Sequence, residues 1–468
     1  MVDDRKQSGA ARPKKGGEAE VVVESLAFGG AGVARADGFV LFVPHTAPGD
    51  RLRVVVTKSK GSWGEARGRE LLEAGPARVE PLCPLVGTCG GCNWQHVSIE
   101  AQREAKERIV RDALRQIAGL ADAVVEPLVE SPDTWRYRNK MEFTFGASRL
   151  DGGLVAGFHE AGNWRHILDA ERCWLAPESM ERALRAAVAE GARQGLSAWC
   201  PHEKRGTLRQ LVVRHSVHED ALLALLLTGD ESLDFPAFAA ALRSAEPSLK
   251  AVVWGLNARD SDVARAERVL ATDGDAFLEE RLGGLRFRIS PASFFQSNTR
   301  GAERLYEVVR GYASLTGAES VLDAYCGTGT IAQYCAPAAR EVLGLELLTE
   351  AVWDARENAE RNGLANCRFV SGDIRHTLPV ALGSMPGRID RVIVDPPRGG
   401  MERKALEQLL AIRAPVFVYV SCNPTTMARD LQQALEAGYR LDRVRPVDMF
   451  PQTYHVEAVA RLVLGGGA

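Results

Sequence analysis

The 468-residue sequence lacks the marks of a membrane, secreted or strongly polyanion-binding protein. No apolar run approaches the roughly 20 residues that span a bilayer. The N-terminal stretch, MVDDRKQSGAARPKKGG, has no apolar core of the kind a secretory signal needs. The formal net charge is only −3, and the nine cysteines show no disulfide-like spacing. We therefore expect a cytoplasmic protein whose cysteines are available for metal or catalytic work.

Positive charge is nevertheless concentrated locally. The segment from Arg51 to Arg69 contains six basic residues and one acidic residue, Glu65. In Trp135–Lys140 (WRYRNK), basic and aromatic residues are interleaved. A later group consists of Lys204, Arg205, Arg209 and Arg214. Such patches suit phosphate contact and base stacking. A solvated charged surface is the alternative for each patch taken singly.

The first part of the chain predicts a tail followed by a small barrel. Residues 1–17 are mildly basic and have no apolar core, which is typical of a disordered tail. Residues 18–78 contain the strand-like runs AEVVVESL, DGFVLFVP and DRLRVVVTK, separated by Gly-rich turns. Short strands at this spacing predict a β-barrel. With its basic third run, this region resembles a TRAM domain, an OB-like RNA-binding module.

Three thiols then follow within ten residues, around a pair of glycines. A soft metal or a cluster is suited to thiolates that converge in this way. Zinc sites usually show two paired half-sites, so a triplet with a distant fourth cysteine favours a [4Fe–4S] cluster over zinc or free thiols. The triplet is Cys83, Cys89 and Cys92, and the fourth ligand is either Cys173 or its rival Cys200.

Residues 79–290 predict an α+β domain without a sharp motif of its own beyond these cysteines. Apolar residues at helical spacing predict helices at 99–117 and 177–194. The runs LRQLVVRH, ALLALLL and AVVWGLN predict strands after the second helix.

From residue 291 onward, strands alternate with helices, which predicts a doubly wound parallel sheet. The first strand runs into a Gly-rich turn in Ser320–Thr330 (SVLDAYCGTGT), and no phosphate-binding Lys follows it. Acids that surround such a turn suit a cationic nucleoside without phosphates, which is S-adenosylmethionine. Capping of a helix is the alternative for one of these acids. Four of the five predicted strands end in an acid, at Asp323, Glu346, Asp373 and Asp395.

The fifth strand ends in a thiol. Val416–Pro424 (VFVYVSCNP) predicts a buried strand that runs into a tight loop. Ligands of open α/β sheets bind just beyond the carboxyl ends of strands, so Cys422 is placed where chemistry occurs. An inert buried cysteine is the alternative.

Three motifs together carry a resemblance to a known family. Asp395–Gly400 (DPPRGG), Ser421–Pro424 (SCNP) and His455–Glu457 (HVE), in this order and after the cysteine triplet, resemble the RNA uracil-5 methyltransferases. The resemblance covers nearly the whole chain beyond the tail. It implies that residues 291–468 form a class I, Rossmann-like methyltransferase domain.

The resemblance also implies roles for individual residues. It implies that Cys422 is the nucleophile and that Glu457 is the proton acceptor. It implies that the cluster ligands are Cys83, Cys89, Cys92 and Cys173. It implies that the S-adenosylmethionine site contains Gln296, Tyr325, Thr330, Glu346, Asp373 and Asp395.

The chemistry of uracil agrees with these roles. Carbon 5 of uracil is a poor nucleophile until a thiolate adds at carbon 6, and Cys supplies a thiolate that can leave again. A carboxylate must then remove the proton from carbon 5, which suits Glu457. A base stacked in a helix cannot be reached by a thiol, so the target uridine must lie in a loop or be flipped out. Trp135, Tyr137 and Phe294 are candidate stacking partners.

The target and the partners are expectations of the same kind. The TRAM-like barrel and the cluster favour ribosomal RNA of the large subunit (23S rRNA), and the T-loop uridine of tRNA is the second choice. An amino-group nucleic-acid methyltransferase and a non-catalytic, cluster-bearing RNA-binding factor remain alternatives. We expect a monomer.

Overall fold

The computed structural model describes residues 13–200, 202–260, 263–291, 293–383 and 387–465. Two compact units are formed, one from the first 109 residues together with Phe450–His455 and one from the remainder. Most of the predicted tail, residues 1–12, lies outside the described residues. Among the helices of the described ranges, none is long and apolar enough to cross a membrane.

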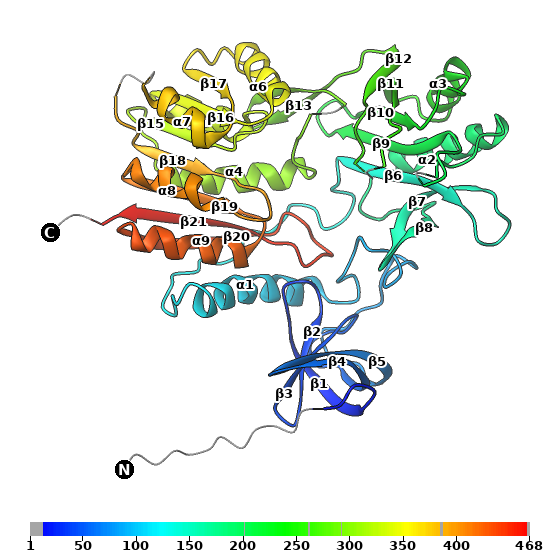
Figure 1. The fold of residues 1–468 in the computed structure, drawn as a ribbon, viewed down its shortest axis with the longest axis horizontal. Helices are drawn as coiled ribbons and strands as arrows, with labels where there is room; N and C mark the ends of the chain where they lie inside the picture. The colour runs from blue at the N-terminus through cyan, green and yellow to red at the C-terminus, as the bar shows by residue number, and fades with distance from the viewer. Residues whose placement is uncertain (1–12, 201, 261–262, 292, 384–386, 466–468) are drawn as a thin grey trace. The chain divides into compact units, whose positions relative to one another are not determined.

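The first unit contains a closed barrel of five strands in the order β1-β2-β3-β5-β4 (blue in Figure 1). Alternate side chains fill its interior, as the period of a strand requires. The strands are β1 (Glu18–Leu26), β2 (Gly32–Ala36), β3 (Phe39–Val43), β4 (Arg51–Lys60) and β5 (Trp63–Glu73). The sequence predicted the barrel but only three of these strands.

Of the two missed strands, β2 and β5, the longer strand β5 is polar and interrupted by glycines, which hides its alternation. Gly64 cannot carry a side chain, because an added Cβ would lie 2.6 Å from the carbonyl oxygen of Lys58 on the neighbouring strand. The close approach of the two backbones therefore requires glycine at this position, although a glycine in a sequence usually indicates a turn.

The rest of the first unit is built around Trp94, which is fully buried. Its indole Nε1 donates to the carbonyl of Gly30 at 3.0 Å, and its amide donates to Gln452 O at 3.0 Å. Gln102, on helix α1 (Ile99–Gln116), accepts from the Gln452 amide at 2.8 Å. These bonds tie residues 450–455 to the first unit, although they are remote from it in sequence.

The second unit contains two seven-stranded sheets. The first has the order β12-β11-β10-β9-β6-β7-β8 and is antiparallel apart from the β10–β11 pair. With helices α2 and α3 it forms the predicted α+β region, and both helices contribute to its core. Its elements are β6 (Lys140–Ala147), β7 (Leu154–Glu160), β8 (Asn163–Asp169), α2 (Glu178–Arg193), β9 (Leu208–Ser216), β10 (Ala221–Thr228), α3 (Phe235–Ala245), β11 (Leu249–Leu256) and β12 (Arg268–Gly274).

A hairpin and a helix connect the two sheets along the chain. The hairpin consists of β13 (Leu278–Leu282) and β14 (Leu285–Ile289), and its turn is made by two glycines with positive φ. Helix α4 (Thr299–Ala313) follows and packs against β19 and β21 of the second sheet. Asn298 caps α4 by accepting a hydrogen bond from the Gly301 amide at 2.9 Å.

The second sheet has the order β17-β16-β15-β18-β19-β21-β20 (Figure 1). Its first five strands are parallel, and β21 pairs antiparallel with both β19 and β20. The strands are β15 (Ser320–Ala324), β16 (Glu341–Glu346), β17 (Cys367–Ser371), β18 (Arg391–Val394), β19 (Val416–Ser421), β20 (Tyr439–Val447) and β21 (Glu457–Leu464). The prediction of a doubly wound sheet is confirmed, and so is the pairing of the final strand with the strand that precedes Cys422.

The helices between these strands pack in two groups. Helix α4 packs on α5, and α8 packs on both α7 and α9. The sequence reading missed α7, which contains Pro379 and is therefore a poor helical pattern. The helices are α5 (Thr330–Cys335), α6 (Thr349–Arg361), α7 (Ile374–Gly383), α8 (Arg403–Ala411) and α9 (Pro424–Glu436), with a short 3₁₀ turn at Ala336–Ala338.

Strand order reverses between β15 and β18, since the chain runs outward from β15 in one direction and from β18 in the other. Such a switch point leaves a crevice at the carboxyl ends of the strands where ligands bind. The predicted strand-end acids and Cys422 all come from this end of the sheet.

Candidate active site

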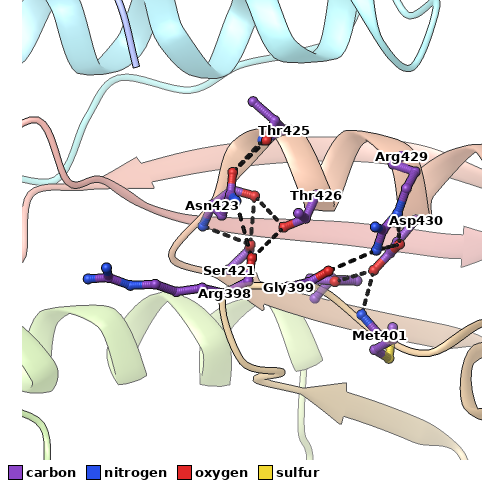
Figure 2. Close-up of polar contacts among 10 residues, drawn as sticks. Arg398, Gly399, Met401, Ser421, Asn423, Thr425, Thr426, Arg429 and Asp430 are labelled. Atoms are coloured by element: carbon purple, nitrogen blue, oxygen red, sulfur yellow. Dashed lines mark hydrogen bonds and ion pairs between the residues drawn. The ribbon is translucent and has the colours of Figure 1, made fainter. Parts of the chain in front are cut away.

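Cys422 lies directly after β19, in a loop that hydrogen bonds hold closed. The Ser421 hydroxyl accepts from the Asn423 amide at 3.1 Å and donates to the Asn423 carbonyl at 3.0 Å. The Asn423 side chain caps α9 by accepting from the Thr425 amide at 3.1 Å (Figure 2). Pro424 follows as the first helical residue. The thiol therefore lies between a strand that has just ended and a helix that has just begun.

Glu457 is the first residue of β21, and strand register relates it to Cys422. Ser421 pairs with Ala458, so the next positions along each strand are Cys422 and Glu457. Because successive side chains of a strand alternate between faces, Cys422 and Glu457 point to the side opposite Ser421 and Ala458. The register therefore places the thiol and the carboxyl on one side of the sheet.

The electrostatics of the site couple these two groups. Burial, followed by the charges of Glu457 and Asp395, raises the pKa of the Cys422 thiol to about 11. Burial and the charge of Asp395 raise the pKa of Glu457 to about 8. Burial raises the pKa of Asp395 to about 6. A thiol and two carboxyls thus influence one another within a largely dehydrated site.

Arg398 carries the positive charge that opposes the rise in the pKa values of Cys422 and Glu457. No role was predicted for it from the sequence. Its charge lowers the pKa values of both Cys422 and Glu457, against the larger effect of burial. Its carbonyl accepts hydrogen bonds from Asn423 Nδ2 at 3.2 Å and Thr426 Oγ1 at 3.4 Å. The available signal was its place in the Asp-Pro-Pro-Arg motif, directly after a strand-end acid.

The Gly-rich turn after β15 is shaped by an unusual backbone. Tyr325 has φ of 65° and is followed by Gly327 and Gly329 with φ of 55° and 74°. A tyrosine in the left-handed region is uncommon and costs conformational energy. Glu346 supports the turn from the end of β16, since its Oε2 accepts from the Gly327 amide at 3.0 Å and its Oε1 from the Leu348 amide at 2.9 Å.

Asp323, at the end of β15, is fully buried and makes no side-chain hydrogen bond among the described residues. Burial, and then the charge of Asp395, raises its pKa well above the usual range, while the nearby Ala332 amide partly opposes this. A buried carboxyl without a close partner is rare in proteins. It is the feature expected where a cationic ligand is to be received.

Asp373 has a different environment from the other strand-end acids. It accepts a hydrogen bond from the Arg375 amide at 3.0 Å, at the start of α7, and the Arg375 guanidinium forms an ion pair with it. These hydrogen bonds lower the pKa of Asp373 well below its usual range. The alternative of a helix cap therefore applies to Asp373, and a ligand hydroxyl there would share the carboxylate with Arg375.

Gln296 and Thr330 are both held by neighbouring residues. The Gln296 carbonyl accepts from Asn139 Nδ2 at 2.8 Å, which ties this segment to the chain just before β6. The Thr330 hydroxyl lies 2.9 Å from the hydroxyl of Tyr306, a fully buried residue of α4. The Thr330 side chain is thus already engaged in the fold.

The cysteine triplet occupies a tight loop of the first unit. The Cys89 amide donates to Leu85 O at 2.8 Å, and the Cys83 amide donates to Gln95 Oε1 at 3.1 Å. In the second unit, the Cys173 amide donates to Glu181 Oε1 at 3.2 Å, and Arg136 forms an ion pair with the same carboxylate. Within the described ranges, no group of three or more His, Cys, Asp or Glu side chains is arranged to hold a metal ion. The predicted cluster therefore gains no support from the structure.

The predicted basic patches differ in their surroundings. On the barrel, exposed cations pair with glutamates that lie far away in sequence, since Arg51 and Arg53 both contact Glu20. Arg209 and Arg214, by contrast, are buried. Arg209 donates to the Asn257 carbonyl at 2.8 Å, and Arg214 donates to the Pro291 carbonyl at 3.2 Å. The interpretation of these two buried arginines as phosphate contacts is therefore wrong.

The aromatic candidates for base stacking are also unequal. Trp135 and Tyr137 line an open groove of about 490 Å³ in the second unit, but Tyr137 is itself buried. Phe294 is 67% exposed, and its carbonyl accepts from the Thr328 hydroxyl at 3.1 Å. Phe294 is thus held beside the Gly-rich turn with its ring accessible.

Known families match three parts of the chain. The tRNA (uracil-5-)-methyltransferase family matches residues 380–463, which include Cys422 and Glu457. A methyltransferase domain matches 321–395 and the TRAM domain matches 12–68. RNA methyltransferases that are 38–40% identical match 88–95% of this chain, and together with these domains they show that the chain belongs to the uracil-5 RNA methyltransferase family. It is an enzyme that methylates RNA, with an N-terminal TRAM barrel and a C-terminal class I methyltransferase fold.

Relatives match this uracil-5 methyltransferase over nearly its full length. An uncharacterized RNA methyltransferase of Halalkalibacterium halodurans is 38% identical, over 95% of this chain and 96% of its own. An uncharacterized RNA methyltransferase of Chlorobaculum tepidum is 40% identical, over 88% of this chain and 89% of its own. Among solved structures, the tRNA (uracil-54, C5)-methyltransferase of Pyrococcus abyssi, crystallised with S-adenosyl-L-homocysteine, is 28% identical with a TM-score of 0.74. It covers 95% of this chain and 100% of its own.

Proposed function

We propose that the protein methylates carbon 5 of a uridine in RNA, with S-adenosylmethionine as donor and a covalent bond between Cys422 and carbon 6 of the base. The observation that carries this proposal is the strand register that sets Cys422 and Glu457 on one side of the sheet. In this chemistry the nucleophile and the proton acceptor act on the same uracil ring, so the two side chains must lie within one site.

The turn after β15 fits S-adenosylmethionine. Asp323 is a buried carboxyl without a close partner, which suits a cationic ligand. Glu346 uses its oxygens for two backbone amides and keeps lone pairs that can accept from ribose hydroxyls. Asp323, Glu346 and Asp373 would hold the cofactor, with Gln296, Tyr325, Thr330 and Asp395 around it. When bound, S-adenosylmethionine supplies an electrophilic methyl group.

The residues of the chain account for the remaining steps. The Cys422 thiolate forms a bond to carbon 6, and the electron pair of the ring double bond passes to the carbonyl oxygen as an enolate. Carbon 5 then accepts the methyl group. Glu457 takes the proton from carbon 5, and the sulfur–carbon bond breaks as the ring double bond returns. A pKa of about 8 makes Glu457 a stronger base than an ordinary carboxylate.

The trapping of an intermediate tests the mechanism. Glu457→Gln should form the adduct and methylate it but fail to release it, so a denaturation-resistant complex of RNA and protein should appear on a gel. Cys422→Ala should form no adduct and no 5-methyluridine. Full activity of Cys422→Ala would instead support an amino-group methyltransferase. Absence of any adduct or product with RNA from cells lacking the gene would support a non-catalytic RNA-binding factor.

We propose ribosomal RNA of the large subunit as the target, because the TRAM domain is present and the cysteine triplet accompanies it. The tRNA T-loop is the second candidate, since the P. abyssi enzyme of similar structure acts on uracil 54 of tRNA. Mass spectrometry of 5-methyluridine in rRNA and tRNA fractions, from cells with and without the gene, separates the two. Loss confined to tRNA would overturn the first choice.

We also propose that Cys83, Cys89, Cys92 and Cys173 bind a [4Fe–4S] cluster, on the softness of four thiolates alone. We assign the cluster no step in the reaction, and its proposed role is to shape an RNA-facing region. Iron and acid-labile sulfide in anaerobically purified protein should disappear in Cys83→Ser and persist in Cys200→Ser. Zinc in place of iron, or no metal, would overturn the assignment.

A further inference from the structure

We propose that Asp430 is a positioning residue that clamps the loop 395–401 onto the nucleophile loop 421–424 and so holds Arg398 where its charge acts on Cys422. The proposal rests on the proposed function only for the role of Cys422 toward uracil. The clamp itself consists of contacts between residues of β19, α9 and the two loops (Figure 2). Of these residues, Met401, Thr426, Arg429 and Asp430 lie outside the motifs that the sequence analysis singled out.

Asp430 is a carboxylate of α9 that is only 1% exposed. Its Oδ2 accepts from the Tyr419 hydroxyl of β19 at 2.7 Å and from the Met401 amide at 2.9 Å. Its Oδ1 accepts from Arg429 Nε at 2.8 Å and from an Arg429 NH2 group at 2.6 Å. Both oxygens are satisfied, and one carboxylate joins a strand, a helix and a loop. Loss of such a buried partner leaves neighbouring polar groups unpaired.

The loop approaches this carboxylate closely, and Gly400 makes the approach possible. Gly400 has φ of +77°. An added Cβ would lie 2.8 Å from Asp430 Oδ2 and 2.4 Å from the Arg429 guanidinium. Arg429 also donates to the carbonyl of Gly399 at 3.1 Å. The close contact between the loop and the Arg429–Asp430 pair of α9 therefore depends on glycine at position 400.

The other end of the clamp lies beside the nucleophile. Asn423 Nδ2 and the Thr426 hydroxyl both donate to the carbonyl of Arg398. Figure 2 shows the Arg398 side chain extending away from these contacts. The backbone carbonyl of Arg398 is thus held by residues that follow Cys422, while Arg398 itself is an exposed residue.

The position of Arg398 matters because of the other charges around Cys422. Glu457 and Asp395 disfavour the thiolate, and Arg398 favours it. If the clamp loosens, Arg398 moves and the thiolate loses this support. A neighbouring opposite charge is worth roughly 1–3 pKa units at close range. We therefore expect a clamp variant to raise the pKa of Cys422 by about 0.5–1 unit.

The test is the pH dependence of Cys422 alkylation by iodoacetamide, followed by mass spectrometry of the peptide that contains Cys422 in the full-length protein. Asp430→Asn should shift the profile to higher pH and slow alkylation at pH 8 by about three- to tenfold. Removal of the negative charge of Asp430 would by itself lower the pKa of the thiol. A rise therefore reports movement of Arg398, and an unchanged or lowered pKa overturns the proposal.

Gly400→Ala provides a second variant that leaves every charge in place. It should shift the profile in the same direction, and the double variant should shift it by less than the sum, because both changes break one contact. Asp442→Asn is the matched control, since Asp442 is likewise paired with arginines (Arg440, Arg443 and Arg461) but belongs to β20. A shift in the control equal to that in Asp430→Asn would overturn the clamp.

Alkylation needs no RNA, so these outcomes are separate from those of the proposed reaction. In methylation assays the clamp variants should lower kcat and leave the KM for S-adenosylmethionine nearly unchanged. If Asp430→Asn fails to fold, Gly400→Ala and Asn423→Ala decide the matter, and unshifted alkylation profiles in both would contradict the clamp.

Discussion

Ser421 of β19 pairs with Ala458 of β21, and this pair sets the relation between Cys422 and Glu457. The two side chains are separated by 35 positions in the chain and become neighbours because β21 inserts antiparallel between β19 and β20. A shift of the register by one residue would turn Glu457 to the other face of the sheet.

Replacement of Glu457 should change stability in a pH-dependent way. Its pKa is raised from 4.5 to about 8, mainly by burial, so the unfolded chain loses this proton first as pH rises. The folded state therefore loses stability between about pH 4.5 and pH 8, by a few kcal/mol at most. Glu457→Gln should raise Tm by a few degrees at pH 9 and change it little at pH 4.5. An equal Tm gain at both pH values would contradict this reasoning, and Glu350→Gln on the exposed face of α6 is the control.

The rate of reaction should depend on the same proton. Glu457 must be ionised to act as a base and Cys422 must be a thiolate to attack, so kcat/KM in the free enzyme should rise with pH through about 8 and continue to rise toward about 11. Arg398 lowers the pKa values of both Glu457 and Cys422, so Arg398→Gln should displace this rise to higher pH. Initial rates of 5-methyluridine formation from pH 6 to 10 measure both effects. A profile that is flat over this range would show that neither proton limits the reaction.

Glu346 should contribute directly to affinity for S-adenosylmethionine. Glu346→Gln removes a charged acceptor at the Gly-rich turn, which is worth about 1.5–3 kcal/mol. The Kd measured by calorimetry without RNA should therefore rise by roughly ten- to a hundredfold. Glu350→Gln, four residues further on in α6, should bind with the affinity of the unchanged protein. An unaltered Kd in Glu346→Gln would remove this residue from the cofactor site.

Exposed and buried arginines should differ in their effect on RNA binding. Arg53 on the barrel pairs with Glu20 and Glu70 at the surface, where ion pairs contribute little and can be exchanged for phosphates. Arg53→Gln should therefore lower the salt dependence of RNA binding by about 0.7 in the log–log slope for a single strand. Arg209→Gln should lower thermal stability and leave the slope unchanged. A slope that responds only to Arg209 would place the RNA contact away from the barrel.

Much of the second sheet could be predicted because its signals are local. Each parallel strand is a short buried run, and each ends near an acid or a thiol that the sequence shows directly. Where local signals conflict with tertiary packing, prediction failed. Gly64 predicts a turn although it lies within strand β5, and Pro379 predicts the end of a helix although α7 continues past it.

The same limit applied to charge. A count along the chain showed six basic residues against Glu65 between Arg51 and Arg69, yet Arg53 forms ion pairs with Glu20 and Glu70, which lie outside that range. Arg209 and Arg214 appear in sequence as parts of a basic group, and only packing shows that they are buried. Charge is local in sequence, but its partners are determined by the fold.

The sequence by itself determined the kinds of chemistry available: a thiol at a strand end, acids around a Gly-rich turn, and a cysteine triplet. Those features depend on residue type and short spacing, which the chain carries without folding. Only the tertiary structure decided which groups act on one another, as in the register that joins Cys422 to Glu457 and the Asp430 contacts that hold Arg398. These relations join segments that are distant in sequence, and the physical reason is that electrostatic and packing effects depend on distance in space.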